Sequence, residues 1–257
     1  MHPPPRSRIR RLPPPPDVRL DAGHLAVFLD LDGTLVDIAG HPDRIVVNDG
    51  LLAMLAKLQR ACCGSVAIIS GRSIAGIDRH LSPLVLPVAG QHGLERRTAM
   101  GTRIELAGPG LLSPLRQALE NLLRHQAGVL VEDKGMALAV HYRQRPALAS
   151  WLHRSVGQLV AARPGLALLR GKRVVEIKPA AADKGRAIAE FLAEPPYQGR
   201  RPLFIGDDVT DEAGFAAVNA AGGITVKVGA GRTVAHHRLP DVAAVLAWLN
   251  GIAEGTS

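Results

Sequence analysis

The chain has 257 residues, enough for one large domain or two small ones with a substantial core. Hydrophobic residues make up 47% of the chain and aromatic residues 3%, so the core must consist largely of Ala, Val, Leu and Ile, as suits an α/β protein. Lys and Arg number 31 against 23 Asp and Glu, but five of the arginines fall within the first twenty residues. Because aromatic side chains for base stacking are nearly absent, this charge does not favour nucleic acid as a partner.

The chain shows no sign of a membrane partner or of a disulfide framework. No apolar run reaches the roughly twenty residues that a membrane helix needs, and no signal-type segment follows the N-terminal arginines. The only cysteines, Cys62 and Cys63, are adjacent. We expect a cytoplasmic protein whose Pro- and Arg-rich residues 1–22 form a disordered tail.

The first predicted element is a buried strand at Leu25–Leu29 that ends in two carboxylates. Side chains alternate along a strand, so Asp30 and Asp32 project to the same side, and Gly33 allows a sharp turn after them. Ligands of an open parallel sheet bind outside the carboxyl ends of its strands. Two like charges so close are tolerated mainly where a cation binds or where one carboxyl keeps a proton.

Helices and strands then alternate. Apolar spacing predicts a helix at Asp49–Arg60, a strand at Val66–Ile69, a helix at Ile74–Leu81, and a strand with a turn at Leu86–Gly93. Strand, helix and strand in this order imply a right-handed crossover and a parallel sheet.

The order of elements changes between residues 108 and 179. The pattern predicts a helix at Leu111–His125, strands at Val129–Glu132 and Met136–Tyr142, a helix at Ala147–Ala161, and a hairpin of Leu166–Leu169 with Val174–Ile177. The simplest explanation is an α+β domain, an antiparallel sheet with two helices, inserted into a core of residues 23–107 and 180–257.

The alternation resumes after the insert. The predicted elements are a helix at Asp183–Leu192, a strand at Pro202–Ile205, a helix at Glu212–Val218, a strand at Ile224–Val228 and a helix at Val242–Ile252. If the two halves of the sheet rejoin across the insert, residues near 30, 70, 184 and 207 meet at one end of it.

A second acidic cluster follows the strand at Pro202–Ile205. Asp207, Asp208, Asp211 and Glu212 place four acids within six residues, which calls for a cation. Hard oxygen ligands favour Mg²⁺, the usual partner of phosphoryl groups. Alternatively, Asp211 simply caps the helix that follows.

Four ordered motifs resemble those of the haloacid dehalogenase-type phosphatases. They are Asp-Leu-Asp-Gly-Thr-Leu at 30–35, Ile-Ser-Gly-Arg at 69–72, Asp-Lys-Gly at 183–185 and Gly-Asp-Asp-Val-Thr-Asp-Glu at 206–212. Within that superfamily, residues 24–250 are similar to the trehalose-6-phosphate phosphatases. The resemblance implies a Rossmann-type parallel-sheet core with an inserted cap domain that selects the substrate.

The resemblance also implies a role for each motif. Asp30 would attack phosphorus and form an aspartyl-phosphate, and Asp32 would serve as general acid and then as general base. Ser70 would hydrogen-bond a phosphate oxygen, and Lys184 would pair with Asp30 and the phosphoryl group. Asp30, Asp207 and the backbone carbonyl of Asp32 would hold Mg²⁺, with Asp208 and Asp211 nearby as further metal-site residues.

Substrate-binding residues are expected in both domains. In the core they are Gly71, Arg72 and His92, and in the insert they are Glu132, Lys134, Arg143, Lys172, Glu176 and Lys178. Carboxylates and long cations on strands and tight turns can reach sugar hydroxyls, although several of these side chains could equally be ordinary solvated sheet residues.

The predicted activity is Mg²⁺-dependent hydrolysis of trehalose 6-phosphate. Two alternatives stay open: the same chemistry on another sugar phosphate, because catalytic motifs do not define the substrate, and a noncatalytic sugar-phosphate sensor or partner domain of a trehalose-phosphate synthase. The presence of Asp30, Asp32, Lys184 and Asp207 argues against a sensor, since binding alone needs no nucleophile. An association with the synthase is an open possibility.

Overall fold

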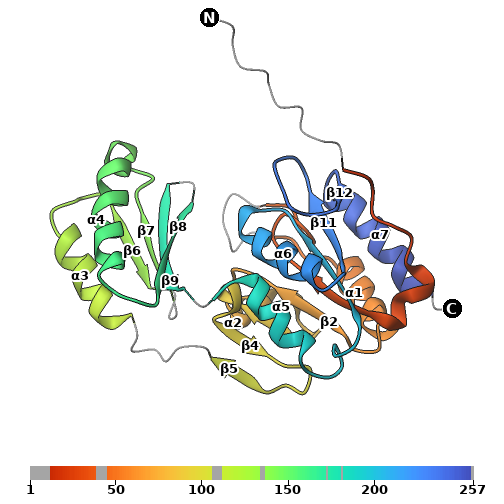
Figure 1. The fold of residues 1–257 in the computed structure, drawn as a ribbon. Coiled ribbons are helices and arrows are strands. Elements are labelled where there is room, and N and C mark those ends of the chain that lie inside the picture. Colours follow the sequence, from red (N-terminus) through yellow and green to blue (C-terminus); the bar gives the residue numbers. More distant parts are fainter. Residues whose placement is uncertain are drawn as a thin grey trace, which may run out of the picture. The chain divides into compact units, whose positions relative to one another are not determined.

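The computed structural model describes residues 12–38, 45–105, 112–133, 137–171, 173–180 and 182–255 (Figure 1). The chain forms two compact units, one of Met1–Arg103 with Lys184–Ser257 and the other of Ile104–Asp183. The first contains a largely parallel sheet and the second an antiparallel one. The predicted α/β class, a parallel-sheet core with an inserted antiparallel α+β unit, is confirmed.

The larger sheet has eight strands in the order β12-β11-β10-β1-β2-β3-β4-β5. Their bounds are β1 Leu25–Leu29, β2 Val66–Ile69, β3 Val88–Gly90, β4 Glu95–Arg97, β5 Arg103–Glu105, β10 Arg201–Gly206, β11 Ile224–Val228 and β12 His237–Leu239. Strands β12 to β3 run parallel, and β4 runs antiparallel to β3. Phe28 of β1 lies opposite Phe204 of β10 and Ala67 of β2, so the carboxyl ends of these three central strands share one edge.

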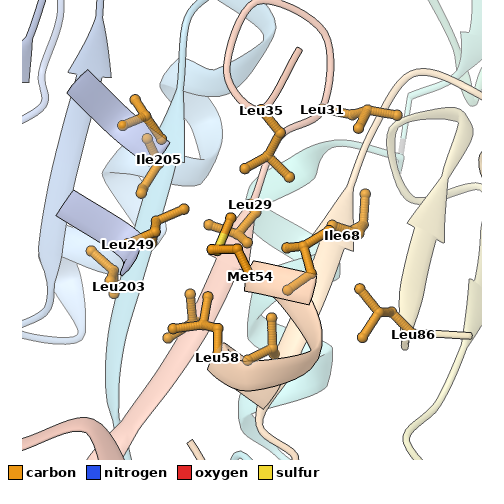
Figure 2. Packing of buried hydrophobic residues seen from close by; sticks show 14 of the residues in the cluster. Leu29, Leu31, Leu35, Met54, Leu58, Ile68, Leu86, Leu203, Ile205 and Leu249 are labelled. Atoms are coloured by element: carbon orange, nitrogen blue, oxygen red, sulfur yellow. The ribbon is translucent and has the colours of Figure 1, made fainter. Parts of the chain in front are cut away.

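Helices cover both faces of this sheet, and the side chains of β1 point alternately into the two hydrophobic cores that result. Val27 and Leu29 pack with helices α1 (Asp49–Ala61), α2 (Ile74–Leu81) and α7 (Val242–Glu254). Figure 2 shows Leu29 among Met54, Leu58, Ile68 and Leu249 in this core. Ala26 and Phe28 face the opposite layer, formed by α5 (Lys184–Leu192) and α6 (Glu212–Ala220). The strand is therefore buried on both faces, as its continuous apolar sequence predicts.

The second unit is a four-stranded sheet with two helices. Its strands are β6 Leu130–Asp133, β7 Leu138–His141, β8 Leu166–Gly171 and β9 Val174–Pro179, in the antiparallel order β6-β7-β9-β8. Leu138, Val140, Val175 and Ile177 pack with helices α3 (Ser113–Leu123) and α4 (Ala149–Ala161). Alternation turns the residues between them to the other face of the sheet.

Each helix and strand predicted from the sequence overlaps one in the structure, with ends shifted by up to a few residues. Three strands of three residues each, β4, β5 and β12, were not predicted. Such short segments carry too few side chains to show a period, and pairing with a neighbouring strand defines them. Among the described residues, no helix combines the length and the apolar character needed to cross a bilayer.

The predicted disordered tail is corrected for residues 12–22. Residues 12–18, here called the proline strap, lead into a short 3₁₀ helix at Arg19–His24. Pro13 accepts a hydrogen bond from the backbone N–H of Arg238 at 3.0 Å, Pro16 accepts one from Trp248 Nε1 at 3.3 Å, and Val18 is buried. Proline lacks a donor but keeps its acceptor, and its restricted backbone loses little entropy on docking. Residues 1–11 lie outside the described part of the chain.

Candidate active site

Asp30 follows the last residue of β1 and is almost completely buried. Its N–H donates to the carbonyl of Ile205 in β10 at 3.0 Å, which ties it to the end of the neighbouring strand. The Thr34 hydroxyl donates to one carboxylate oxygen at 3.0 Å, and Lys184 Nζ donates to the other at 2.7 Å. The predicted nucleophile is thus held on both oxygens by groups that reach it inside the protein.

Lys184 is the first residue of α5, is 2% exposed and lies between two carboxylates. Its ammonium donates to Asp30 at 2.7 Å and to Asp211 at 2.5 Å. Burial by itself lowers the pKa of Lys184, but the charges of Asp30 and Asp211 outweigh it and raise that pKa above its ordinary value. The lysine is therefore a fixed positive charge at the site.

Asp207 brings a third carboxylate to this cluster. One ligand oxygen from each of Asp30, Asp207 and Asp211 lies within 4.8 Å of the others. Burial raises the pKa of Asp30 to about 8, with Asp211 and Asp207 adding to the rise and Lys184 opposing it. Burial and then the charge of Asp211 raise the pKa of Asp207 to about 6. When ionised, the three carboxylates outnumber the nearby ammonium groups of Lys184 and Lys227, and a divalent cation would offset this excess of negative charge.

The donor set fits a hard divalent cation such as Mg²⁺, because all the grouped side-chain atoms are carboxylate oxygens. Gly33, with φ of +84°, packs against the Asp207 carboxylate: a Cβ on it would lie 2.2 Å from Asp207 Oδ2. Only glycine allows both this backbone conformation and this close approach.

Asp211 and Asp208 are joined by hydrogen bonds. The Asp208 side chain accepts from the Asp211 N–H, and Asp211 Oδ2 accepts from the Asp208 N–H at 2.8 Å, which forms a capping box. Asp211 is fully buried, whereas Asp208 is exposed. Asp211 thus joins the cluster. It is also the last residue of the short 3₁₀ turn Val209–Asp211, and its side chain makes no capping hydrogen bond to α6, so the alternative that it simply caps that helix is wrong.

Asp32 is not among the three grouped carboxylates and pairs instead with Arg72. The guanidinium donates through Nε and Nη2 to the two oxygens of Asp32, each at 2.6 Å. The Asp32 side chain is 34% exposed, so this fork faces partly toward solvent. The backbone N–H of Arg72 donates to Ser70 Oγ at 3.2 Å, and Ser70 itself is buried. His92 lies against Gly71, where an added Cβ would meet the imidazole ring at 2.8 Å.

The inserted unit places two predicted carboxylates on one face of its sheet. Glu132, Ala139 and Glu176 are direct cross-strand neighbours on β6, β7 and β9. Glu132 also contacts His141 Nε2 at 2.7 Å. Ala139, which lies between the two glutamates in the register, is fully buried.

The basic residues predicted to bind substrate in the insert differ in their environments. Arg143 is exposed in the turn after β7. Lys178 on β9 is buried, and its ammonium donates to the carbonyl of Ala182. Lys134 and Lys172 lie outside the described residues.

Three residues that the sequence analysis missed support the site. Thr34 donates to Asp30, Lys227 donates from β11 to the backbone carbonyl of Asp207, and Glu95 of β4 accepts the N–H of Ile74 at 2.9 Å. Lys227 had a signal in the sequence, since it is a lone cation within the apolar strand Ile224–Val228. Thr34 lies within the first motif, whereas Glu95 shows its contact only once β3 and β4 pair.

Comparisons with known proteins agree with this architecture. The sequence model of the family described as Trehalose-phosphatase matches residues 28–242. The trehalose-6-phosphate phosphatase of Escherichia coli strain K12 is 45% identical over 228 residues, which cover 88% of this chain and 86% of that protein.

Two solved structures have the same fold. One is the C-terminal domain of a C. albicans trehalose-6-phosphate phosphatase, with a TM-score of 0.81 at 22% identity, covering 96% of this chain and 99% of that one. The other is a haloacid dehalogenase-like hydrolase from B. subtilis, with a TM-score of 0.63 at 14% identity over 88% of this chain and 98% of that one. The fold is therefore haloacid dehalogenase-like, and the family match together with the E. coli relative shows that the chain belongs to the trehalose-phosphatase family.

Proposed function

We propose that this protein hydrolyses trehalose 6-phosphate to trehalose and inorganic phosphate, the last step of trehalose biosynthesis. The observation that carries the proposal is buried Lys184, which joins Asp30 and Asp211 beside Asp207 at the carboxyl ends of the central strands. A carboxylate held by a fixed ammonium next to a cation site suits nucleophilic attack on a phosphate ester. The name and close similarity of the E. coli relative support the choice of substrate.

The cofactor in this proposal is Mg²⁺. Asp30 and Asp207 would hold it through their carboxylates, together with the backbone carbonyl of Asp32. When bound, the ion would supply positive charge beside the transferring phosphoryl group. Asp211, whose two oxygens accept from Lys184 and from the Asp208 N–H, would hold these groups in place.

The proposed reaction has two displacements at phosphorus. An oxygen of Asp30 bonds to phosphorus as the bond to the sugar oxygen breaks, and Asp32 gives its proton to that oxygen. Asp32 then takes a proton from water, whose oxygen bonds to phosphorus as the phosphorus–Asp30 bond breaks. Ser70 and Lys184 would donate hydrogen bonds to the phosphoryl oxygens, which lowers the energy of the charged transition state.

Arg72 would contact the phosphate when substrate binds. In the structure, its guanidinium donates hydrogen bonds to both carboxylate oxygens of Asp32. A phosphoryl group offers the same two-pronged acceptor as a carboxylate, so the guanidinium can transfer to it. That transfer would release Asp32 for its role as acid and base. Gly71 and His92, which contact each other, would shape the same part of the pocket.

Residues 108–179 would act as the cap that selects the sugar. Glu132 and Glu176 present carboxylates on one face of the sheet, suited to accept hydrogen bonds from sugar hydroxyls. Arg143, Lys178, and the undescribed Lys134 and Lys172 complete the proposed set. The cap residues, more than the catalytic ones, would distinguish trehalose 6-phosphate from other sugar phosphates.

The proposal is tested by phosphate release from purified protein with a panel of trehalose, sucrose, glucose and mannose 6-phosphates. We expect a strong preference for trehalose 6-phosphate, loss of release with EDTA, its recovery with Mg²⁺, and no release by Asp30→Asn. Release by that variant at the rate of the unmodified protein would disprove the covalent route. A broad preference would retain the chemistry and reject the substrate, and binding without any release would favour a sensor.

A cytoplasmic location remains a prediction, to be tested by cell fractionation.

A further inference from the structure

Two loops at the edge of the site interlock through their backbones. The first, Ser70–Ile74, is called the motif loop, and the second, Gly90–Glu95, is called the bracing loop. The N–H of His92 donates to the Ser70 carbonyl at 2.9 Å, and the N–H of Gln91 donates to the Arg72 carbonyl at 2.8 Å. The bracing loop therefore holds the segment that carries Ser70 and Arg72.

The contact between the loops leaves no space for further atoms. A Cβ on Gly90 would lie 2.9 Å from the Arg72 carbonyl oxygen and 3.0 Å from Glu95 Oε1. Gln91 and His92 both have left-handed backbone conformations, with φ of 48° and 58°. Such conformations are costly without glycine and persist only where the surroundings determine them. The bracing loop must therefore be held by something outside its own backbone.

One carboxylate oxygen ties both loops together. Glu95 lies on β4 directly opposite Gly90 of β3. Its Oε1 accepts the N–H of Ile74, the first residue of α2, at 2.9 Å, and it also accepts Gln91 Nε2 at 3.2 Å. The negative charge lies at the N-terminal end of α2, where the helix dipole favours it. Glu95 thus links the end of the motif loop to the strained start of the bracing loop.

We propose that Glu95 is a positioning residue that places Ser70 and Arg72 for binding the phosphoryl group. This inference rests on the proposed function and deepens it, since it names what holds the phosphate-binding side of the site. Glu95 acts through the motif loop rather than by touching substrate. Its loss should therefore weaken binding and turnover of every phosphate monoester while leaving the affinity for Mg²⁺ and the choice among sugars unchanged.

The test compares three variants of the full chain. Glu95→Ala removes the acceptor, and Glu95→Gln keeps an amide oxygen at the same place. Asp78→Ala is the matched control. Arg97 of β4 donates to both carboxylate oxygens of Asp78 on α2, each at 2.7 Å, so this pair also joins α2 to β4 but does so away from the motif loop. The measurements are kcat/KM for trehalose 6-phosphate and for p-nitrophenyl phosphate, inhibition by orthovanadate, Mg²⁺ affinity by calorimetry, and Tm.

For Glu95→Ala we expect both kcat/KM values and the orthovanadate affinity to fall by about tenfold or more, because a misplaced catalytic group is costly. Glu95→Gln should stay within about threefold of the unmodified protein, since it keeps the acceptor. Asp78→Ala should lower Tm without this loss. An unchanged orthovanadate affinity in Glu95→Ala, or an equal loss in Asp78→Ala, would overturn the inference.

Two further arms keep the result clear. If Glu95→Ala does not fold, Gln91→Met removes only the side-chain donor to Glu95 and should lower orthovanadate affinity in the same direction; no change would overturn the inference. If the unmodified protein cleaves p-nitrophenyl phosphate but not trehalose 6-phosphate, the proposed substrate is wrong while Glu95 is still tested on the smaller ester. If it cleaves neither, the proposed function fails, and orthovanadate affinity still reports on the motif loop.

Discussion

At the scale of single residues, the proposed cation site should depend on the close approach of Gly33 to Asp207. The Gly33→Ala substitution adds a methyl group 2.2 Å from Asp207 Oδ2 at a backbone φ of +84°. We expect the carboxylate to be displaced, and Mg²⁺ affinity measured by calorimetry and phosphatase activity to fall by about a hundredfold, the scale of a misplaced catalytic group.

The control for Gly33→Ala is Gly222→Ala. Gly222 has φ of +69°, but a Cβ there would meet nothing within 4 Å. This variant carries only the backbone strain, about 1–2 kcal/mol of stability, and should keep its Mg²⁺ affinity. Equal losses of affinity in the two variants would show that strain, rather than the collision with Asp207, is the cause.

The raised pKa values of Asp207 and Asp30 predict how pH and Mg²⁺ act on stability. Both values, about 6 and about 8, lie above the ordinary 3.8, so without Mg²⁺ the folded state binds more protons than the unfolded chain between about pH 4 and 8. The free energy of unfolding should then fall as pH rises through this window. If Mg²⁺ binds at this cluster as proposed, it must displace these protons, so it should raise Tm more at about pH 8 than at about pH 5.

Thermal melts with EDTA and with Mg²⁺ at the two pH values measure this effect. Asp207→Asn, which cannot ionise, should reduce the difference between them. An increase in Tm with Mg²⁺ that is the same at both pH values would contradict the assignment of the cluster as the cation site.

At the scale of elements, the proline strap adds stability by covering β12 and α7. Deletion of residues 1–18 removes the contacts of Pro13 and Pro16 and the buried side chain of Val18. We expect the free energy of unfolding to fall by about 2–4 kcal/mol, from one buried valine and the three hydrogen bonds that Pro13, Pro14 and Pro16 accept from β12 and α7. Urea denaturation measures it. Deletion of residues 1–11 leaves all of these contacts in place and should cause a smaller loss; an equal loss in both deletions would refute a stabilising role for the strap.

At the scale of the whole molecule, the two units should divide the work between chemistry and selection. Each has its own hydrophobic core, and the predicted nucleophile and cation site lie entirely in the larger one. Glu176→Ala should therefore raise KM for trehalose 6-phosphate by about 10- to 100-fold, the loss expected for a charged hydrogen bond, and leave hydrolysis of p-nitrophenyl phosphate nearly unchanged.

The matched control is Glu120→Ala, which removes an exposed carboxylate of α3 in the same unit that pairs with Arg116. It should change neither the KM for trehalose 6-phosphate nor the hydrolysis of p-nitrophenyl phosphate. Equal loss of both activities in Glu176→Ala would mean that Glu176 supports the fold of the unit rather than selecting the sugar.

The local sequence determined the regular elements and the motifs that end them. Leu25–Leu29 is continuously apolar because the strand is buried on both faces, and Asp30 must follow it at the open edge of the sheet. Helix α2 matches its predicted bounds because its apolar period and the Ser73 cap are both local signals. The four motifs were therefore readable before any contact between them was known.

Only the tertiary structure decided which groups within those motifs touch. Lys184 lies 154 residues from Asp30 along the chain, Arg72 donates to the Asp32 carboxylate, and Glu95 of β4 accepts the N–H of Ile74 at the start of α2. The strands β4 and β12 and the docked proline strap likewise depend on neighbours that sequence periodicity cannot identify. The physical reason is that periodicity reports how one segment meets water and core, whereas hydrogen bonds between distant side chains exist only after the sheet has brought its edges together.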